Sequence, residues 1–348
     1  MNKESFGTGR HGEAVSVYEI ENKSGDKVRV TDYGAALVSI IVPDKNGTMQ
    51  DVLLGYDNVT GYENNTCYFG AVIGRNGNRI ADAKVTIDGT VYQLDQNDNE
   101  NNLHSGNNGM DAKVWDVKEH TENSITFTCT SADGEQGFPG TMKAQITYTL
   151  TDAHAVELAY EAVSDKDTVA NFTNHAYFNL SGHASGDVLG QELMLRASHF
   201  TPVIDAKAIP TGEIAAVAGT PMDFTTAKPI GRDMDANDTQ VHYGGGFDHN
   251  FVLDKSEKGA FELAAEAYSP ETGIVMKTYT DLPGIQFYSG NFVTKQDGKQ
   301  GAVYDKRHGF CLETQYFPNS VNDPNFEAPF LKAGEVYKTK TSYQFGVK

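Results

Sequence analysis

The chain has 348 residues, of which 39% are hydrophobic and 22% are charged, an ordinary globular composition. Its formal net charge of -19 argues against nucleic acid and anionic membranes as partners, because both attract clustered Lys and Arg side chains. The same charge counts more weakly against phosphorylated substrates, and solubility is the simplest reason for it.

The N-terminus and the cysteines are those expected of a reduced, cytoplasmic protein. Residues 1–5 lack the apolar stretch of a signal peptide, and no run of about 18 apolar residues occurs that could span a membrane. Cys67, Cys129 and Cys311 are odd in number, far apart and outside any C-x-x-C pair. We therefore expect neither a disulfide framework nor a zinc site.

Alternation of apolar and polar residues, interrupted by turns, is the dominant pattern. Residues 125–130 and 141–150 alternate as half-buried strands do. Glycine-containing turns, which supply the positive φ of tight hairpins, separate further strand candidates. In chain order, the expected hairpins join 37–42 to 52–54 through Asn46-Gly47, 84–87 to 90–94 through Asp88-Gly89, and 261–268 to 274–280 through Glu271-Thr272-Gly273.

Helical periodicity is scarce. Short helices are expected only near Asn58–Glu63 and Ile230–Ala236, and no β-α-β rhythm indicates a parallel sheet. We predict an all-β protein, a large antiparallel β-sandwich with few short helices whose polar loops carry the function. Residues 1–348 are expected to form a single domain, since all-β proteins often run long as one unit.

Two polar loops are candidate binding segments. Residues 74–80 place two arginines and two asparagines, among them Asn78 and Arg79, beside glycines, which suits a cluster of sugar hydroxyls. Residues 101–106 place His104 in a loop. Taken alone, the first segment also fits a polar turn, and the second fits a loop histidine whose hydrogen bonds are satisfied.

Three strand-like segments carry further candidates. In residues 171–180, alternation places a polar set on one strand face, namely Thr173, His175, Tyr177 and Asn179. Asp248 follows a run of glycines and is either a turn residue or an acceptor for hydroxyls. Glu313 lies in an apolar run, either on the solvent face of its strand or as a functional carboxylate with a raised pKa. Gln286 lies on a neighbouring strand candidate.

Other catalytic signatures are missing from the sequence. His175 and His183 are eight positions apart and His242 and His249 are seven apart, which matches no zinc motif. The sequence contains no P-loop, dinucleotide fingerprint or G-x-S-x-G elbow. We therefore expect no metal and no cofactor.

Six motifs, in this order, resemble those of the aldose 1-epimerase (galactose mutarotase) family. They are Gly74 to Ile80, Leu103 to Gly106, Thr173 to Leu180, Phe247 to Asn250, Pro283 to Asn291, and Leu312 to Pro318. Any one of them is weakly specific, but the ordered set is strongly so, and with minor matches the resemblance runs from about Thr31 to about Asn325. Ser105 departs from the pattern, which has glycine there, and is expected to tilt the loop or narrow the site.

The resemblance implies a galactose mutarotase-like supersandwich and an enzyme without cofactors. Such an enzyme interconverts the α and β anomers of free aldohexoses such as galactose and glucose, by acid/base opening and closure of the ring. The family pattern makes Glu313 the base, His175 the acid at the ring oxygen, and His104 a second histidine that stabilises the opening ring. Positions that match sugar-binding residues are Asn78, Arg79, Asp248 and Gln286, with Tyr177 expected to support packing or binding. An ionised Glu313 and a protonated His175 predict a bell-shaped pH–rate profile near neutrality.

Arg75 and His249 are expected to lie outside the binding set. The family's binding arginine matches Arg79, which leaves Arg75 a structural role. His249 follows Asp248 on a strand and is expected to point away from it.

Three other functions are compatible with the same residues. A sugar-binding module of the same fold needs no catalytic pair, a hexose-6-phosphate 1-epimerase needs extra cationic groups, and a glycoside hydrolase needs two carboxylates at a set separation. The preferred sugar and the oligomeric state are not readable from the sequence.

Overall fold

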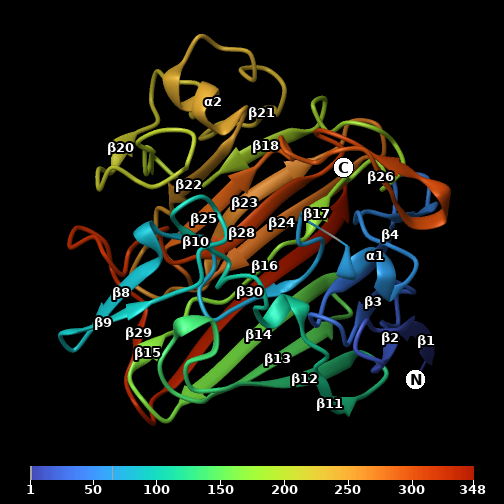
Figure 1. Ribbon diagram of the computed structural model, residues 1–348. Coiled ribbons are helices and arrows are strands. Elements are labelled where there is room, and N and C mark those ends of the chain that lie inside the picture. The colour runs from blue at the N-terminus through green and yellow to red at the C-terminus, as the bar shows by residue number, and fades with distance from the viewer. Residues whose placement is uncertain (1, 65) are drawn as a thin grey trace.

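The chain folds into antiparallel sheets that stack on one another (Figure 1). The computed structural model describes residues 2–64 and 66–348. Its largest sheet has nine strands, in the order β11 (Asp116–His120), β12 (Ser124–Ser131), β13 (Met142–Leu150), β14 (Ala155–Ser164), β30 (Val336–Val347), β24 (Ile274–Thr280), β23 (Glu262–Tyr268), β18 (Glu192–Leu195) and β21 (Lys228–Pro229).

A six-stranded sheet carries most of the polar strand motifs. Its order is β17 (Tyr177–Phe178), β28 (Phe310–Gln315), β25 (Gly284–Tyr288), β22 (Asp248–Val252), β19 (His199–Phe200) and β20 (Ala215–Ala216). A five-stranded N-terminal sheet, blue in Figure 1, runs in chain order through β1 (Asn2–Thr8), β2 (Ala14–Glu21), β3 (Lys27–Thr31), β4 (Leu37–Pro43) and β5 (Met49–Asp51).

Short two-stranded pairs, two short α-helices and four short 3-10 helices complete the ordered elements among the described residues; the 3-10 helices span Ala81–Ala83, Met110–Ala112, Glu135–Gly137 and Lys299–Gly301. The pairs are β6 (Val72–Ile73) with β16 (Thr173–Asn174), β7 (Arg79–Ile80) with β10 (Asn102–Leu103), β8 (Lys84–Ile87) with β9 (Thr90–Gln93), β15 (Thr168–Val169) with β29 (Phe330–Leu331), and β26 (Gln296–Asp297) with β27 (Val303–Tyr304). The α-helices are α1 (Val59–Glu63) and α2 (Thr239–Gly244). None of the helices within the described ranges has the length and apolar character needed to cross a membrane.

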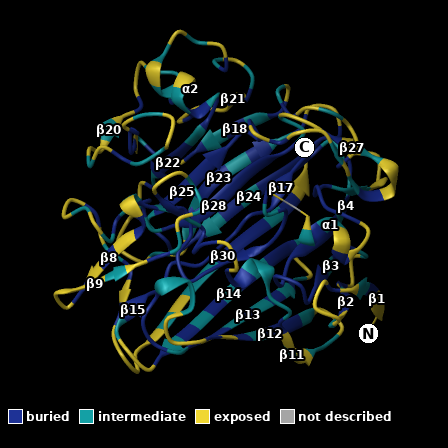
Figure 2. Cartoon of the chain, in the orientation of Figure 1, coloured by how far each residue is buried: buried dark blue, intermediate teal, exposed yellow. Residues whose placement is uncertain are grey.

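The main core lies between the six-stranded and nine-stranded sheets. Tyr343 of β30 packs its ring 4.8 Å from that of Phe178 of β17, and its hydroxyl donates a hydrogen bond to the carbonyl of Leu312 of β28. Figure 2 shows the central strands buried and the connecting loops exposed. The predicted all-β sandwich with few short helices is therefore confirmed.

Strand β28 is buried along its whole length, because both of its faces are covered. Phe310 and Leu312 belong to the core between the sheets. By strand alternation, Cys311, Glu313 and Gln315 point to the opposite face. Glu313 is only 3% exposed, so a place on the solvent face is wrong for this carboxylate.

Most of the predicted local elements are present, with two corrections. Strands β12 and β13 and the hairpins β8–β9 and β23–β24 lie where alternation places them, and α1 begins after Asn58, whose side chain accepts a hydrogen bond from the Gly61 amide. The partner of β4 is β5, ahead of the predicted 52–54.

The prediction of a helix at Ile230–Ala236 is wrong. That segment forms successive turns in which amides bond to carbonyls three residues back. The helix begins later, after Asp238, whose carboxylate accepts from the amides of Gln240 and Val241. A side-chain cap of this kind fixes where a short helix can start.

Candidate active site

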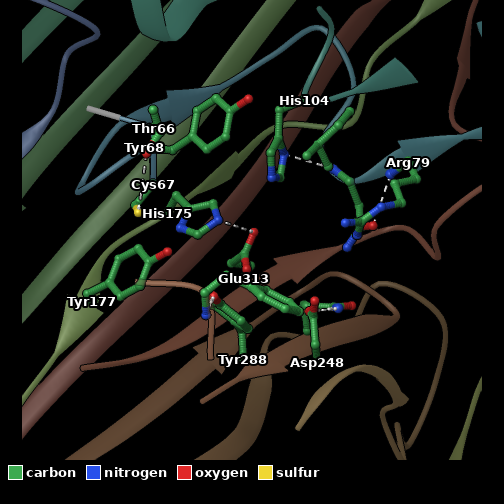
Figure 3. Close-up of a pocket in the computed structure, with 14 residues that line it drawn as sticks. Thr66, Cys67, Tyr68, Arg79, His104, His175, Tyr177, Asp248, Tyr288 and Glu313 are labelled. Atoms are coloured by element: carbon green, nitrogen blue, oxygen red, sulfur yellow. Dashed lines mark hydrogen bonds and ion pairs between the residues drawn. The ribbon is translucent and has the colours of Figure 1, made fainter. Parts of the chain in front are cut away.

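A cavity of about 180 Å³ opens over the outer face of the six-stranded sheet (Figure 3). Its lining comes from seven separate stretches of the chain: Thr66, Cys67 and Tyr68; Asn78 and Arg79; Leu103 and His104; His175 and Tyr177; Asp248; Gln286, Tyr288 and Phe292; and Glu313. All eight residues that the sequence singled out for the site are among them.

Antiparallel register brings the strand residues of this site together. Gln286 of β25 is the direct partner of Glu313 of β28 on one side and of Asn250 of β22 on the other. Asp248 lies two residues along β22 on the same face, within reach of Gln286, whose Nε2 donates to Asp248 Oδ1 at 2.7 Å. Segments more than 60 residues apart thus meet in one row.

His175 and Glu313 face each other at the centre of the cavity. His175 Nε2 lies 3.7 Å from Glu313 Oε2, and both side chains are almost fully buried. Among the described residues, Glu313 Oε2 has no hydrogen-bond partner. A buried carboxylate oxygen without a partner is costly, which indicates an acceptor kept for a ligand.

Burial moves the pKa values of both groups towards their neutral forms. It lowers the pKa of His175 from 6.5 to about 4. It raises the pKa of Glu313 well above 4.5, where the charge of Asp248 raises it further and that of Arg79 opposes the shift. The two groups therefore share a single proton over a wide pH range.

His104 is the third titratable group at the centre. Its ring centroid lies 5.2 Å from that of His175, in an edge-on arrangement. The backbone amide of Asn78 donates to His104 Nδ1 at 3.1 Å, so the proton of the neutral ring must be on Nε2. Burial, followed by the influence of His175, lowers the pKa of His104 well below 6.5. His104 therefore presents a neutral N–H donor to the cavity (Figure 3).

His104, His175 and Glu313 lie close enough for a metal ion, since their donor atoms are all within 4.8 Å of one another. Metal ligation by imidazole requires a nitrogen lone pair. The Asn78 amide donates to His104 Nδ1, so the proton of the neutral ring is on Nε2 and this nitrogen has no free lone pair for a metal. The donor set consequently suits hydrogen bonding and proton transfer better than metal coordination.

A network of amides holds the polar wall opposite the histidines. Gln315 Nε2 donates to Gln286 Oε1 at 3.2 Å and to Asn250 Oδ1 at 3.1 Å, while Gln315 Oε1 accepts from Asn78 Nδ2 at 3.3 Å. The Asp248 carboxyl is buried, which raises its pKa, with Arg79 acting against the shift. The sequence did not single out Gln315, although it lies two residues after Glu313 and therefore on the same strand face.

The two arginines of the 74–80 segment have separate environments. Arg79 lines the cavity and pairs through Nε with Asp98 Oδ2 at 2.7 Å. Arg75 is 2% exposed and points away from the cavity, with its guanidinium bonded to a set of backbone carbonyls: those of Ser131, Ala132, Pro139 and Gly140. The predicted structural role of Arg75 is confirmed.

Ser105 joins the two binding loops without lining the cavity. Its hydroxyl accepts from the Asn76 amide at 2.8 Å and donates to the Asn76 carbonyl at 3.1 Å. Ser105 has a φ of 74° and is buried. The expectation that this serine narrows the site is wrong, because its side chain forms hydrogen bonds between the two loops and does not reach the cavity.

The 171–180 segment does not form one continuous strand face. It splits into β16 and β17, with His175 and Ala176 between them. The His175 and Tyr177 rings stack at 5.1 Å and both line the cavity. Asn179 instead donates to the carbonyls of Gly186 and His308. His249 also lies outside the cavity lining, packed against Phe200, as expected.

Six lining residues were not predicted as site residues: Thr66, Cys67, Tyr68, Leu103, Tyr288 and Phe292. Tyr68 packs against both candidate catalytic histidines, with its ring centroid 4.8 Å from that of His104 and 5.7 Å from that of His175. Phe292 is 60% exposed at the rim and stacks on Tyr288. Two signals were available in the sequence, since Leu103 and Tyr288 lie inside the motifs Leu103–Gly106 and Pro283–Asn291.

Fold and cavity together define a class of protein, a β-sandwich with a polar cavity that is centred on a buried histidine and a buried glutamate. The sequence model described as aldose 1-epimerase matches residues 16–344. A galactose mutarotase of Sus scrofa is 41% identical over 92% of this chain and 91% of its own, and an aldose 1-epimerase of Escherichia coli is 36% identical over 96% of each. The solved aldose epimerase homologue from C. elegans superposes with a TM-score of 0.89, at 29% identity, over 96% of this chain and 99% of that one.

The chain belongs to the aldose 1-epimerase family. The resemblance and the enzyme class predicted from the motifs, a carbohydrate isomerase of the mutarotase type, are confirmed.

Proposed function

We propose that this enzyme equilibrates the anomers of free aldohexoses, galactose and glucose among them, with Glu313 as base and His175 as acid. The observation that carries the proposal is the His175–Glu313 pair, 3.7 Å apart and buried in a polar cavity. The anomeric hydroxyl and the ring oxygen of a pyranose are bonded to the same carbon. Two proton-transfer groups at this separation can serve these two neighbouring oxygens together.

Ring opening removes one proton from the anomeric hydroxyl and adds one proton to the ring oxygen. Glu313 takes the proton of the anomeric hydroxyl, His175 Nε2 gives a proton to the ring oxygen, the C1–O5 bond breaks, and the aldehyde forms. This leaves a protonated Glu313 and a neutral His175, the two forms that burial favours. Rotation about the C1–C2 bond presents the other aldehyde face, and closure reverses both transfers.

The remaining lining residues are assigned to binding. We expect His104 Nε2–H to donate to the oxygen that loses its bond to C1 and so to stabilise developing negative charge, a role that the Asn78 amide at its Nδ1 supports. Asp248 accepts from sugar hydroxyls, while Asn78, Arg79 and Gln286 supply a mixed set of donors and acceptors that matches adjacent hydroxyls. Tyr177 supports His175 by stacking on its ring.

Three broader expectations belong to the same proposal. We assign the whole of residues 1–348 to one domain, place the enzyme in the cytoplasm in free-sugar metabolism, and expect neither nucleic acid nor membrane as a partner. The net charge of -19 disfavours nucleic acid and anionic membranes as partners, and the thiols of Cys129 and Cys311, which form no disulfide, fit the reducing cytoplasm.

Polarimetry tests the proposal directly. Freshly dissolved α-galactose and α-glucose should reach anomeric equilibrium faster with the protein, and His175→Asn should abolish the acceleration. The methyl glycosides of both sugars serve as controls, because they cannot mutarotate. Reducing sugar released from them would instead indicate a glycoside hydrolase, and protection of the fold by sugar without any acceleration would indicate a binding module.

A further inference from the structure

Phe292 is an exposed aromatic residue in the lining of a polar cavity. It is 60% exposed and has no side-chain atom that can form a hydrogen bond with a ligand. Single exposed apolar side chains are common on protein surfaces and need no explanation by themselves. Among the exposed large hydrophobic side chains of the described residues, however, Phe292 is the one that lines the cavity.

The position of the Phe292 ring is fixed by its neighbours. Its backbone amide donates a hydrogen bond to the Tyr288 hydroxyl at 2.7 Å, and the two rings are nearly parallel, with an angle of 18° and centroids 6.2 Å apart. The ring also lies beside Gly245, where a Cβ atom would be 3.6 Å from it. Tyr288 is paired in register with Asp248, so this aromatic pair adjoins the polar wall of the cavity (Figure 3). A ring held in this way loses little conformational freedom when a ligand packs against it.

A pyranose needs both polar and apolar partners. Its hydroxyls lie mostly around the edge of the ring, where acceptors such as Asp248 bind them. Its axial C–H bonds make the two ring faces largely nonpolar, and such a face is buried favourably against an aromatic ring. The rings of Tyr68 and Tyr177 are stacked on His175, and both residues are less exposed than Phe292. The Phe292 ring is therefore the aromatic surface most open to a sugar in this cavity.

We propose that Phe292 is a substrate-binding residue, whose ring packs against a nonpolar face of the sugar and strengthens the binding of galactose more than that of glucose. The inference rests on the proposed function for the identity of the sugars. In galactose the 4-hydroxyl is axial, which leaves H3, H4 and H5 together on the opposite face, whereas in glucose H4 lies on the other side of the ring. The face with the axial 4-hydroxyl would place that group against carbon atoms that cannot bond to it, at a free-energy cost. The H3–H5 face of galactose avoids this cost and offers the larger nonpolar patch.

The test combines steady-state polarimetry on galactose and glucose with saturation-transfer NMR on 1,5-anhydro-D-galactitol. This galactose analogue has no anomeric hydroxyl and cannot react, so the NMR measurement reports contact with the sugar whether or not the protein has activity. The variants are Phe292→Ala, which removes the ring, and Phe292→Tyr, which keeps it. Phe261→Ala is the matched control, because Phe261 is also exposed and stacks on a tyrosine, Tyr279, at 6.2 Å, but lies outside the cavity lining.

We expect F292A to raise KM about 5-fold for galactose and about 2-fold for glucose, the size of a lost aromatic contact. Its kcat should stay nearly unchanged, because the ring contacts carbon atoms and not the oxygens that exchange protons. F292Y and F261A should match the wild type. Saturation transfer to the analogue should be strongest at H3, H4 and H5 with the wild type and should weaken there with F292A.

An unchanged KM in F292A, or an equal rise of KM for the two sugars, would overturn the proposal. So would saturation transfer to H3, H4 and H5 that is the same with F292A as with the wild type. A wild type that accelerates neither sugar would instead contradict the proposed function, and the NMR comparison would still decide whether the Phe292 ring contacts the analogue.

Discussion

Arg75 and Arg79 lie four residues apart in one motif, and the structure predicts opposite consequences for their loss. The Arg75 guanidinium donates to four backbone carbonyls and to the hydroxyls of Ser131 and Thr168, and no carboxylate of the described residues forms an ion pair with it. Arg75→Met keeps most of the side-chain length but leaves these buried carbonyls without donors. A buried polar group left without its hydrogen-bond partner costs about 1–3 kcal/mol, so the loss of several together should lower the unfolding free energy by at least about 3 kcal/mol.

Arg79→Met is the matched comparison. Arg79 makes one partly exposed ion pair, with side-chain exposures of 15% and 22% for Arg79 and Asp98. Pairs of this kind contribute about 0–1 kcal/mol, so the stability of R79M should stay close to that of the wild type. Its KM should rise, because a lining donor is lost.

Urea unfolding followed by Trp fluorescence measures the difference. Trp115 is the one tryptophan of the chain, is buried, and donates from Nε1 to the Met110 carbonyl. It therefore reports the loss of the core. Equal stability of R75M and the wild type, or equal destabilisation by R75M and R79M, would refute the division of roles between the two arginines.

Three further predictions concern pH and the loops. The pair is active only while His175 and Glu313 share one proton, so the pH profile of kcat/KM should be bell-shaped. Activity should fall below about pH 4, where the pair takes up a second proton, and again at alkaline pH, where it loses the shared proton with the raised pKa of Glu313. A flat profile from pH 3 to about 10 would contradict the pair. Asp248→Asn removes a charge that raises the Glu313 pKa, so the alkaline limb should move to lower pH, whereas Arg79→Met should move it to higher pH; pH titration of both variants gives the signs. Ser105→Gly loses two buried hydrogen bonds to Asn76 but relieves a positive φ, so urea unfolding should show a net loss of about 1 kcal/mol with little change in KM.

The fold class and most of the proposed site residues could be predicted from the sequence. The pairing of distant strands and the hydrogen bonds between site residues could not. Hairpins can be predicted from strand alternation and glycine turns, because the two strands of a hairpin are adjacent in the sequence. The pairing of β28 with both β17 and β25 joins segments far apart in sequence, and local pattern does not specify it. The shape of residues 171–180 was mispredicted for this reason, because pairing with β6 and β28 interrupts the strand at His175.

Besides the six lining residues, residues that contact the site only through other side chains were missed. Cys311 and Gln315 flank Glu313 on the same strand face. Neither side chain lies in a pattern that would predict a catalytic role. Their contacts are with His175, Gln286 and Asn78, all more than 20 residues away in the chain. Ser105 was noticed as a departure, but its partner Asn76 could be found only from the structure.

The central claim is that Glu313 and His175 exchange protons with the anomeric and ring oxygens of a free sugar. The most direct measurement is the rate of exchange between the α and β anomers of [1-¹³C]glucose at equilibrium, by two-dimensional exchange NMR, with wild-type protein and with Glu313→Gln. The account predicts exchange cross-peaks far above the uncatalysed level with the wild type and a loss of at least about 1,000-fold in E313Q, because glutamine cannot accept the hydroxyl proton. Exchange that survives in a correctly folded E313Q would contradict the assignment of the base.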